Sequence, residues 1–134
     1  KMKTPHIVPL STQAVALLKA LQEMGTGADL LFPGERDHQK PMSNNTILFA
    51  LYRMGYHGRM TGHGFRGVAS TILHELGHRH DLIEIQLAHQ ERNKVSAAYN
   101  HAKYVPQRAV MMQAWADHLD ALRKGGVVIP LKAA

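Results

Sequence analysis

The sequence predicts a mainly helical domain of five to six helices, with a small β-hairpin remnant at the N-terminal end. Three observations favour this fold class. Apolar residues recur at helical spacing along most of the chain, small polar residues suited to N-caps precede these stretches, and Gly or Pro follows them. The 134 residues suit a single domain, and a hydrophobic content of 45% is sufficient for a core. We therefore expect residues 1–134 to form one domain.

The first elements are a strand and two helices. Residues 5–10, Pro-His-Ile-Val-Pro-Leu, are typical of a short strand. Ser11 is a good N-cap for a helix that ends at Gly25. Ser43 is expected to cap a second helix, which ends at Gly55. The side chains that would face inward in this second helix are Ile47, Leu48, Leu51 and Met54.

Four more helices are expected after a Gly-rich connection. They begin near His63, Asp81, Asn93 and Pro106. The first of the four ends with Gly77 as its C-cap, and the last ends near Lys124. The stripe predicted to be buried on the helix that begins at His63 consists of Phe65, Val68, Ile72 and Leu76.

The charge balance favours a polyanionic partner. Lys and Arg number 16 against 10 Asp and Glu, so the formal net charge is +6 and the isoelectric point is near 9.8. No run approaches the roughly 20 apolar residues of a membrane-spanning helix, and no signal-peptide pattern opens the chain. The absence of cysteine excludes disulfides and thiolate chemistry. We expect a soluble cytoplasmic protein, and the first residue, Lys1, suggests a piece of a longer chain.

The pattern with the most chemical content is His63-Gly-Phe-Arg66, followed by Leu87-Ala-His89 and then by Tyr99. Residues three positions apart share one face of a helix, so His63 and Arg66 are expected side by side. An arginine fork matches phosphate oxygens, and an imidazole can donate to the same group or move its proton. A tyrosine oxygen can form a covalent intermediate. Together these side chains could hold a phosphodiester and attack it.

Four segments carry a family resemblance: residues 5–10, 61–66 (TGHGFR), 83–89 (IEIQLAH) and 97–100 (AAYN). With them the chain resembles the C-terminal catalytic domain of tyrosine recombinases, the phage integrases, and in particular the P4-type integrases of prophages and genomic islands. The resemblance implies the tyrosine-recombinase catalytic-domain fold. It also implies a site-specific recombinase that cleaves and rejoins DNA during integration and excision.

The same resemblance assigns roles to the conspicuous side chains. Arg66 would be the second of two family arginines and would clamp the non-bridging phosphate oxygens. His63 would hydrogen-bond the same phosphate, and His89 would complete the set of ligands. Tyr99 would attack and form a 3′-phosphotyrosyl link. Tyr104 is the rival nucleophile, but Tyr99 lies ten residues after His89, close to the family spacing.

The family also has a general-acid lysine on a hairpin before the Val-Pro-Leu segment. Lys1 matches this position best, and Lys3 is the alternative. The first family arginine and the N-terminal DNA-binding domains lie further upstream, so the domain is expected to be truncated and inactive by itself.

The resemblance implies further properties of a complete enzyme. The chemistry needs neither a metal nor another cofactor, because the phosphotyrosine conserves the bond energy. The implied partners are double-stranded DNA at attachment sites, a homotetramer on that DNA and accessory DNA-bending proteins, without a membrane. The expected location is the bacterial cytoplasm, on the nucleoid.

A competing interpretation comes from His74-Glu75-Leu-Gly-His78, a literal HExxH pattern. Two histidines at i and i+4 can bind zinc while the glutamate activates water. Two observations argue against a zinc-dependent hydrolase. Gly77 is expected to end the helix inside the pattern, and position 84 is Glu where a third histidine ligand would stand. A third hypothesis is a catalytically inactive DNA-binding fragment.

Overall fold

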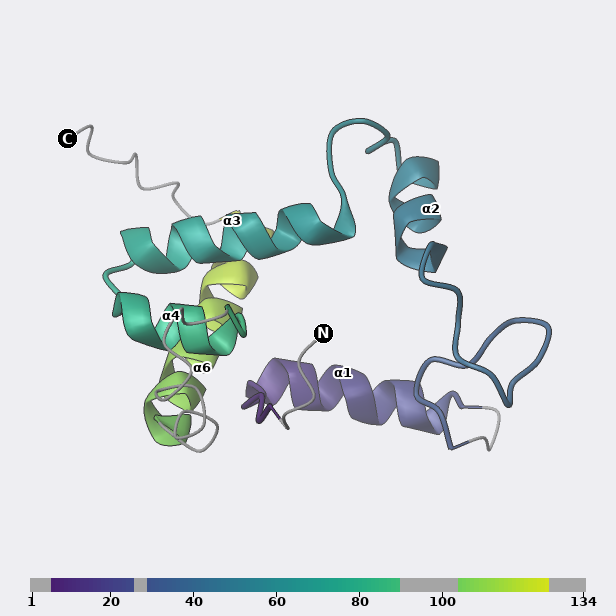
Figure 1. The fold of residues 1–134 in the computed structure, drawn as a ribbon, viewed down its shortest axis with the longest axis horizontal. Coiled ribbons are helices and arrows are strands. Elements are labelled where there is room, and N and C mark those ends of the chain that lie inside the picture. The colour runs from purple at the N-terminus through teal and green to yellow at the C-terminus, as the bar shows by residue number, and fades with distance from the viewer. Residues whose placement is uncertain (1–5, 26–28, 90–103, 126–134) are drawn as a thin grey trace. The chain divides into compact units, whose positions relative to one another are not determined.

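The computed structural model describes residues 6–25, 29–89 and 104–125 (Figure 1). Helices dominate these ranges, as the sequence predicts, and strands are absent from them apart from one isolated antiparallel bridge between Pro33 and Pro41. The helices are α1 (Thr12–Glu23), α2 (Thr46–Arg53), α3 (Gly62–Glu75), α4 (His80–Gln86) and α6 (Val105–Arg123). Within the described part of the chain, none of the helices is long and apolar enough to cross a membrane.

The chain divides into two compact units. One consists of residues 1–14 and 70–134, and the other of residues 15–69. The boundary at residue 70 falls within α3, so the first turns of this helix belong to one unit and its last turns to the other.

The hydrophobic core of the first unit joins the end of α3 to α4 and α6. Its buried members are Leu73, Leu82, Ile83 and Met111. Leu87, Tyr104 and Trp115 pack around them. A seven-residue helix such as α4 is marginal in isolation, because nucleating a helix is costly. Its contact with α6 (Figure 1) therefore stabilises it, and each fully buried Leu or Ile contributes about 1.5–3 kcal/mol.

A buried arginine ties the N-terminal segment to this core. Arg108 of α6 is 0% exposed, and burial lowers the pKa of its guanidinium. Its Nε donates to Gln86 Oε1 at 2.9 Å and its Nη2 donates to the carbonyl of Ile7. His6 Nε2 lies 3.4 Å from the carbonyl of Gln86. The segment before α1 is thus held by the Arg108 side chain of α6 and by the Gln86 backbone carbonyl of α4.

This attachment corrects the strand predicted at residues 5–10. Residues 6–10 form no β-ladder with any described residue, and Pro5 lies outside the described ranges. The Ile7 carbonyl accepts from a guanidinium where a strand would offer it to a neighbouring strand. A short apolar segment can extend, but a strand needs a partner.

Of the two serines predicted to cap α1 and α2, one does so and the other does not. Ser11 behaves as expected: it is buried, and its Oγ accepts the Ala14 N–H at 3.2 Å. Ser43 does not cap α2, which begins three residues later. Its hydroxyl accepts the Asn45 N–H at 3.3 Å and its carbonyl accepts the Thr46 N–H at 3.0 Å. The serine therefore stabilises a turn that precedes the helix.

The predicted inward stripes are largely wrong. Of the α2 set only Leu51 is buried, whereas Ile47 and Met54 are 52% and 68% exposed. The stripe of α3 is exposed at Phe65, Val68 and Leu76. Helical spacing identifies which residues share a face, but it does not show whether another element covers that face.

The remaining boundaries are close to expectation. Helix α4 begins at His80, one residue before the predicted Asp81 cap, and α6 begins at Val105. Gly77 ends α3 as predicted, with a left-handed φ of 80°. Most of the helix predicted from Asn93 lies at residues 90–103, outside the described ranges.

Candidate functional site

His63 and Arg66 lie on the first turns of α3, as their spacing predicts. Thr61 precedes the helix, and its Oγ1 accepts the Gly64 N–H at 3.1 Å, which is the geometry of an N-cap. His63 is then the second residue of the helix and is exposed, while Arg66 is half-buried. The local sequence itself therefore places an imidazole and a guanidinium at one helix start.

The backbone at this helix start also favours an anion. The first N–H groups of a helix have no partner within it, and the helix dipole places partial positive charge there. The first turn of α3 contains no acidic residue that would oppose an anion. Gly64 leaves room for Met60, because a Cβ at this position would lie 2.8 Å from the Met60 sulfur. Such an arrangement can bind a phosphate.

His89 lies just beyond the C-terminal end of α4. Leu87 is the C-cap, and Ala88 adopts a left-handed conformation with φ of 50°. The Ala88 N–H donates to the Ile85 carbonyl at 3.0 Å, and the His89 N–H donates to the Glu84 carbonyl at 3.0 Å. These two bonds form a Schellman motif, which here has alanine where glycine is usual.

The ring of His89 contacts the same glutamate. Its Nδ1 lies 2.7 Å from Glu84 Oε2, and the two side chains are 42% and 33% exposed. The sequence assigns Glu84 no role of its own, although it lies in the family segment 83–89 and at the position of a third zinc ligand. A signal was present nonetheless: a glutamate five residues before the histidine, across a helix end.

The predicted site residues fall in different parts of the structure. His63 and Arg66 belong to the unit of residues 15–69, and His89 belongs to the other unit. Tyr99, Lys1 and the alternative Lys3 lie outside the described residues, so their roles stay predictions.

Tyr104, the rival nucleophile, occupies a structural position. It is the N-cap of α6, with φ of 60°, and its half-buried ring packs against the hydrophobic core. The Arg79 guanidinium lies 5.3 Å from the ring centroid, a cation–π distance. Arg79 also forms an ion pair with Asp81 at 2.6 Å, and this pair raises the pKa of the arginine.

The HExxH pattern does not form the helical face that a zinc protease needs. Helix α3 ends at Glu75, and the His78 N–H turns back to the Leu73 carbonyl at 3.1 Å. His74 instead pairs with His80, with 3.0 Å between Nε2 and Nδ1. Across the described ranges, His, Asp and Glu side chains form no group of three or more suited to a metal ion.

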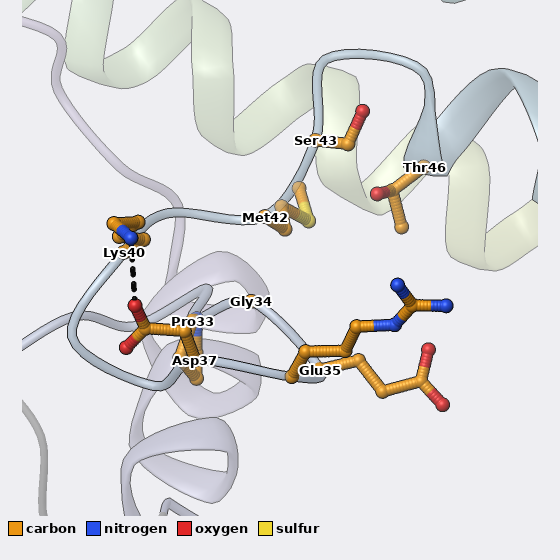
Figure 2. A pocket seen from close by; sticks show the side chains of 9 residues that line it. Pro33, Gly34, Glu35, Asp37, Lys40, Met42, Ser43 and Thr46 are labelled. Atoms are coloured by element: carbon orange, nitrogen blue, oxygen red, sulfur yellow. Dashed lines mark ion pairs between the residues drawn. The ribbon is translucent and has the colours of Figure 1, made fainter.

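An open hollow of about 450 Å³ lies over the loop before α2 (Figure 2). The side chains along it belong to residues 33–37, 40, 42, 43 and 46. Lys40 Nζ lies 2.9 Å from Asp37 Oδ2 (Figure 2), and this contact lowers the pKa of Asp37. Of the predicted site residues that the structure describes, His63, Arg66 and His89, none lines this hollow.

The described part of the chain is mainly helical, and two of its helix termini present His or Arg side chains of the kind that can bind phosphate. Comparison with known proteins makes this more specific: the phage integrase family matches residues 1–105. The chain belongs to this family. It spans about a third of the length of the curated relatives that it matches.

Three relatives illustrate the match. The integrase of Enterobacteria phage P4 is 50% identical over 127 residues, covering 92% of this chain and 29% of that protein. Prophage integrase IntA of Escherichia coli K12 is 41% identical over 129 residues, covering 96% and 31%. The integrase of Shigella phage Sf6 is 42% identical over 116 residues, covering 86% and 30%. No solved structure matches the chain.

Proposed function

We propose that this chain is the catalytic domain of a site-specific DNA recombinase that integrates and excises DNA. The observation that carries the proposal is the presence of both His63 and Arg66 on the first turns of α3, in a chain that belongs to the phage integrase family. The net charge of +6 also favours a DNA partner. The recombinase acts in the bacterial cytoplasm, on the nucleoid.

The scissile phosphate binds at the start of α3. Arg66 donates two parallel hydrogen bonds to its non-bridging oxygens, while His63 and the N–H groups of the first turn add further donors. His89 donates to the same phosphate. Negative charge on these oxygens grows in the transition state, so fixed donors stabilise that state more than the ground state.

Tyr99 is the nucleophile. Its phenolic oxygen gives up its proton, with the His63 imidazole as the acceptor, and forms a bond to phosphorus as the bond from phosphorus to the 5′-oxygen breaks, which leaves a 3′-phosphotyrosine. The departing 5′-oxygen takes a proton from Lys1, with Lys3 as the alternative donor. Attack by another 5′-hydroxyl reverses these steps and rejoins DNA. No external energy source is required, because the phosphotyrosyl ester replaces one phosphodiester bond.

The surroundings of Tyr104 support the choice of Tyr99. A nucleophile must reach the scissile phosphate, whereas the Tyr104 ring packs on the core and beneath Arg79. Moving it would remove contacts that support the start of α6.

The chain spans about a third of the length of its relatives. We place the first catalytic arginine and the N-terminal DNA-binding domains, which the family resemblance implies, in the remaining part of a full-length recombinase. Without that arginine the chain alone binds DNA weakly and does not cleave it. The complete enzyme works as a homotetramer on two duplexes, with accessory proteins that bend the DNA.

The experiment that tests this proposal traps the covalent intermediate. A DNA duplex nicked next to the cleavage site loses its 5′-hydroxyl fragment, so the full-length recombinase stays attached to DNA. We expect Tyr99→Phe to abolish the adduct and Tyr104→Phe to retain it. The reverse pattern would overturn the choice of nucleophile, and an adduct that survives both substitutions would overturn the tyrosine mechanism.

A further inference from the structure

Residue 89 is fastened to residue 84 at two points. The His89 backbone N–H donates to the Glu84 carbonyl at 3.0 Å, and its ring Nδ1 lies 2.7 Å from the Glu84 carboxylate. The first hydrogen bond fixes the position of the His89 backbone, and the second fixes the orientation of its imidazole ring. A surface ion pair between flexible side chains has only the second kind of contact.

The support for this arrangement comes from the core. Ile83, the neighbour of Glu84 in α4, is 0% exposed and packs with Met111 of α6. The backbone that carries the Glu84 carbonyl therefore cannot shift without disturbing the core. Ala88 holds a left-handed conformation between α4 and His89, which is unfavourable for alanine and requires the surrounding bonds to maintain it.

The carboxylate also decides which ring nitrogen carries hydrogen. An ionised carboxylate can only accept, so the contact requires a hydrogen on His89 Nδ1. Nε2 is the ring nitrogen that Glu84 does not contact. A partner of the first nitrogen sets the tautomer and the orientation of the ring as a whole.

We propose that Glu84 is a positioning residue for strand cleavage: it holds His89 by Nδ1 so that Nε2 is presented to the scissile phosphate. This inference rests on the proposed function, in which His89 is a phosphate ligand. Glu84 itself does not touch the DNA. Its effect passes through the His89 ring, and this separates it from a glutamate that merely stabilises the end of α4.

The decisive experiment is a double-mutant cycle on the full-length recombinase. The cleavage rate at saturating DNA is measured with a nicked duplex, and DNA affinity is measured separately. Glu84→Ala should lower the rate about 10- to 100-fold, because a misplaced phosphate ligand costs rate more than binding. Glu84→Gln, whose amide oxygen can still accept from Nδ1, should stay within about threefold of the original rate.

The cycle is completed in a His89→Ala background. If Glu84 acts through His89, Glu84→Ala should have no further effect there. Equal losses in both backgrounds would overturn the proposal and leave Glu84 a structural role. A cleavage rate for Glu84→Gln as low as that for Glu84→Ala would overturn the orientation mechanism.

A second measurement needs no cleavage and so separates this proposal from the proposed function. In this chain, nitrogen NMR of the His89 ring, assigned with a His89→Gln variant, reports the tautomer at a pH of about 8, where imidazoles are neutral. We expect the Nδ1–H form in the original chain and a shift toward Nε2–H in Glu84→Ala. An unchanged tautomer would overturn the role of Glu84, whereas a recombinase that forms no adduct would overturn the proposed function alone.

Discussion

The start of α3 and the end of α4 each place a histidine at a helix terminus, but they do so by different means. At the start of α3, Thr61 caps the helix through bonds to a residue three positions away. At the end of α4, a left-handed Ala88 and a bond to Glu84 hold His89, and buried residues of the core hold α4 itself. The first arrangement is local, and the second depends on tertiary packing.

The difference also affects the chemistry. A helix start supplies N–H groups and partial positive charge, so the backbone there can help bind a phosphate. A helix end supplies carbonyls and partial negative charge, which repel one. At the end of α4 only the side chain of His89 can therefore serve an anion, and its orientation matters more.

The largest expected effect concerns the local arrangement. Arg66→Ala should reduce covalent adduct formation by the full-length recombinase about 10²- to 10³-fold, because one fixed donor to the transition state is lost. Arg66→Lys keeps the charge but not the paired geometry and should recover only part of the rate. A loss no greater than that of Glu84→Ala would contradict the primary role given to the start of α3.

The next effect concerns the tertiary arrangement. Arg108→Ala should lower the free energy of unfolding of this chain by about 3 kcal/mol, because it opens a cavity and leaves the Ile7 carbonyl and Gln86 Oε1 without a donor. Urea denaturation followed by circular dichroism measures this loss. Arg108→Met, which fills a similar volume without a charge to desolvate, is the matched control and should cost less. Equal losses for the two variants would show that the hydrogen bonds to Ile7 and Gln86, which both variants lose, set the stability and that the volume filled at residue 108 does not matter.

A smaller effect tests the cap of α3. Thr61→Ala should lower the free energy of unfolding by about 1 kcal/mol, because the Gly64 N–H loses its side-chain acceptor. Thr61→Ser retains a hydroxyl and should stay near the original stability, as urea denaturation would show. Hydrogen exchange should locate the loss in the first turn of α3. Faster exchange in α4 instead would contradict the local character of this region.

The smallest expected effect is an increase in stability. Ala88→Gly should raise the free energy of unfolding by about 0.5–1 kcal/mol, because glycine adopts a left-handed φ without the steric cost that alanine bears. The measurement is again a urea titration. Ala88→Val, with a β-branched side chain at φ of 50°, should destabilise the chain. If both variants lowered stability, the end of α4 would not have the strain assigned to it.

Much of the helical layout follows from local signals. Ser11 caps the start of α1 and Gly77 follows the end of α3, as predicted. A hydroxyl acceptor and a left-handed glycine each act within one helical turn. The placement of His63 and Arg66 on the first turns of α3 follows equally from helical spacing. Ser43 shows the limit of such signals, because a serine hydroxyl can stabilise a turn as well as cap a helix.

Two other features, the burial of Arg108 and the contact of His89 with Glu84, could not be predicted from such local signals. The burial of Arg108 has no sequence signal, because a lone arginine on a helix is nearly always exposed. The attachment of His89 to Glu84 needs the end of α4 to be known to within one residue, and boundaries are where sequence patterns are least precise.

The sequence by itself determined the helical class, the family and the residue types suited to a phosphodiester, because spacing, caps and motifs are properties of short stretches of chain. Tertiary structure alone decided which apolar faces are covered, that residues 6–10 attach to Arg108 without forming a strand, and how the His89 ring is turned. The covering of apolar faces and the attachment of Ile7 to Arg108 depend on contacts between residues far apart in sequence, whereas the His89 ring is oriented by Glu84, five residues away on a helix that the core supports. Such contacts form only when burial outweighs the entropy of ordering them.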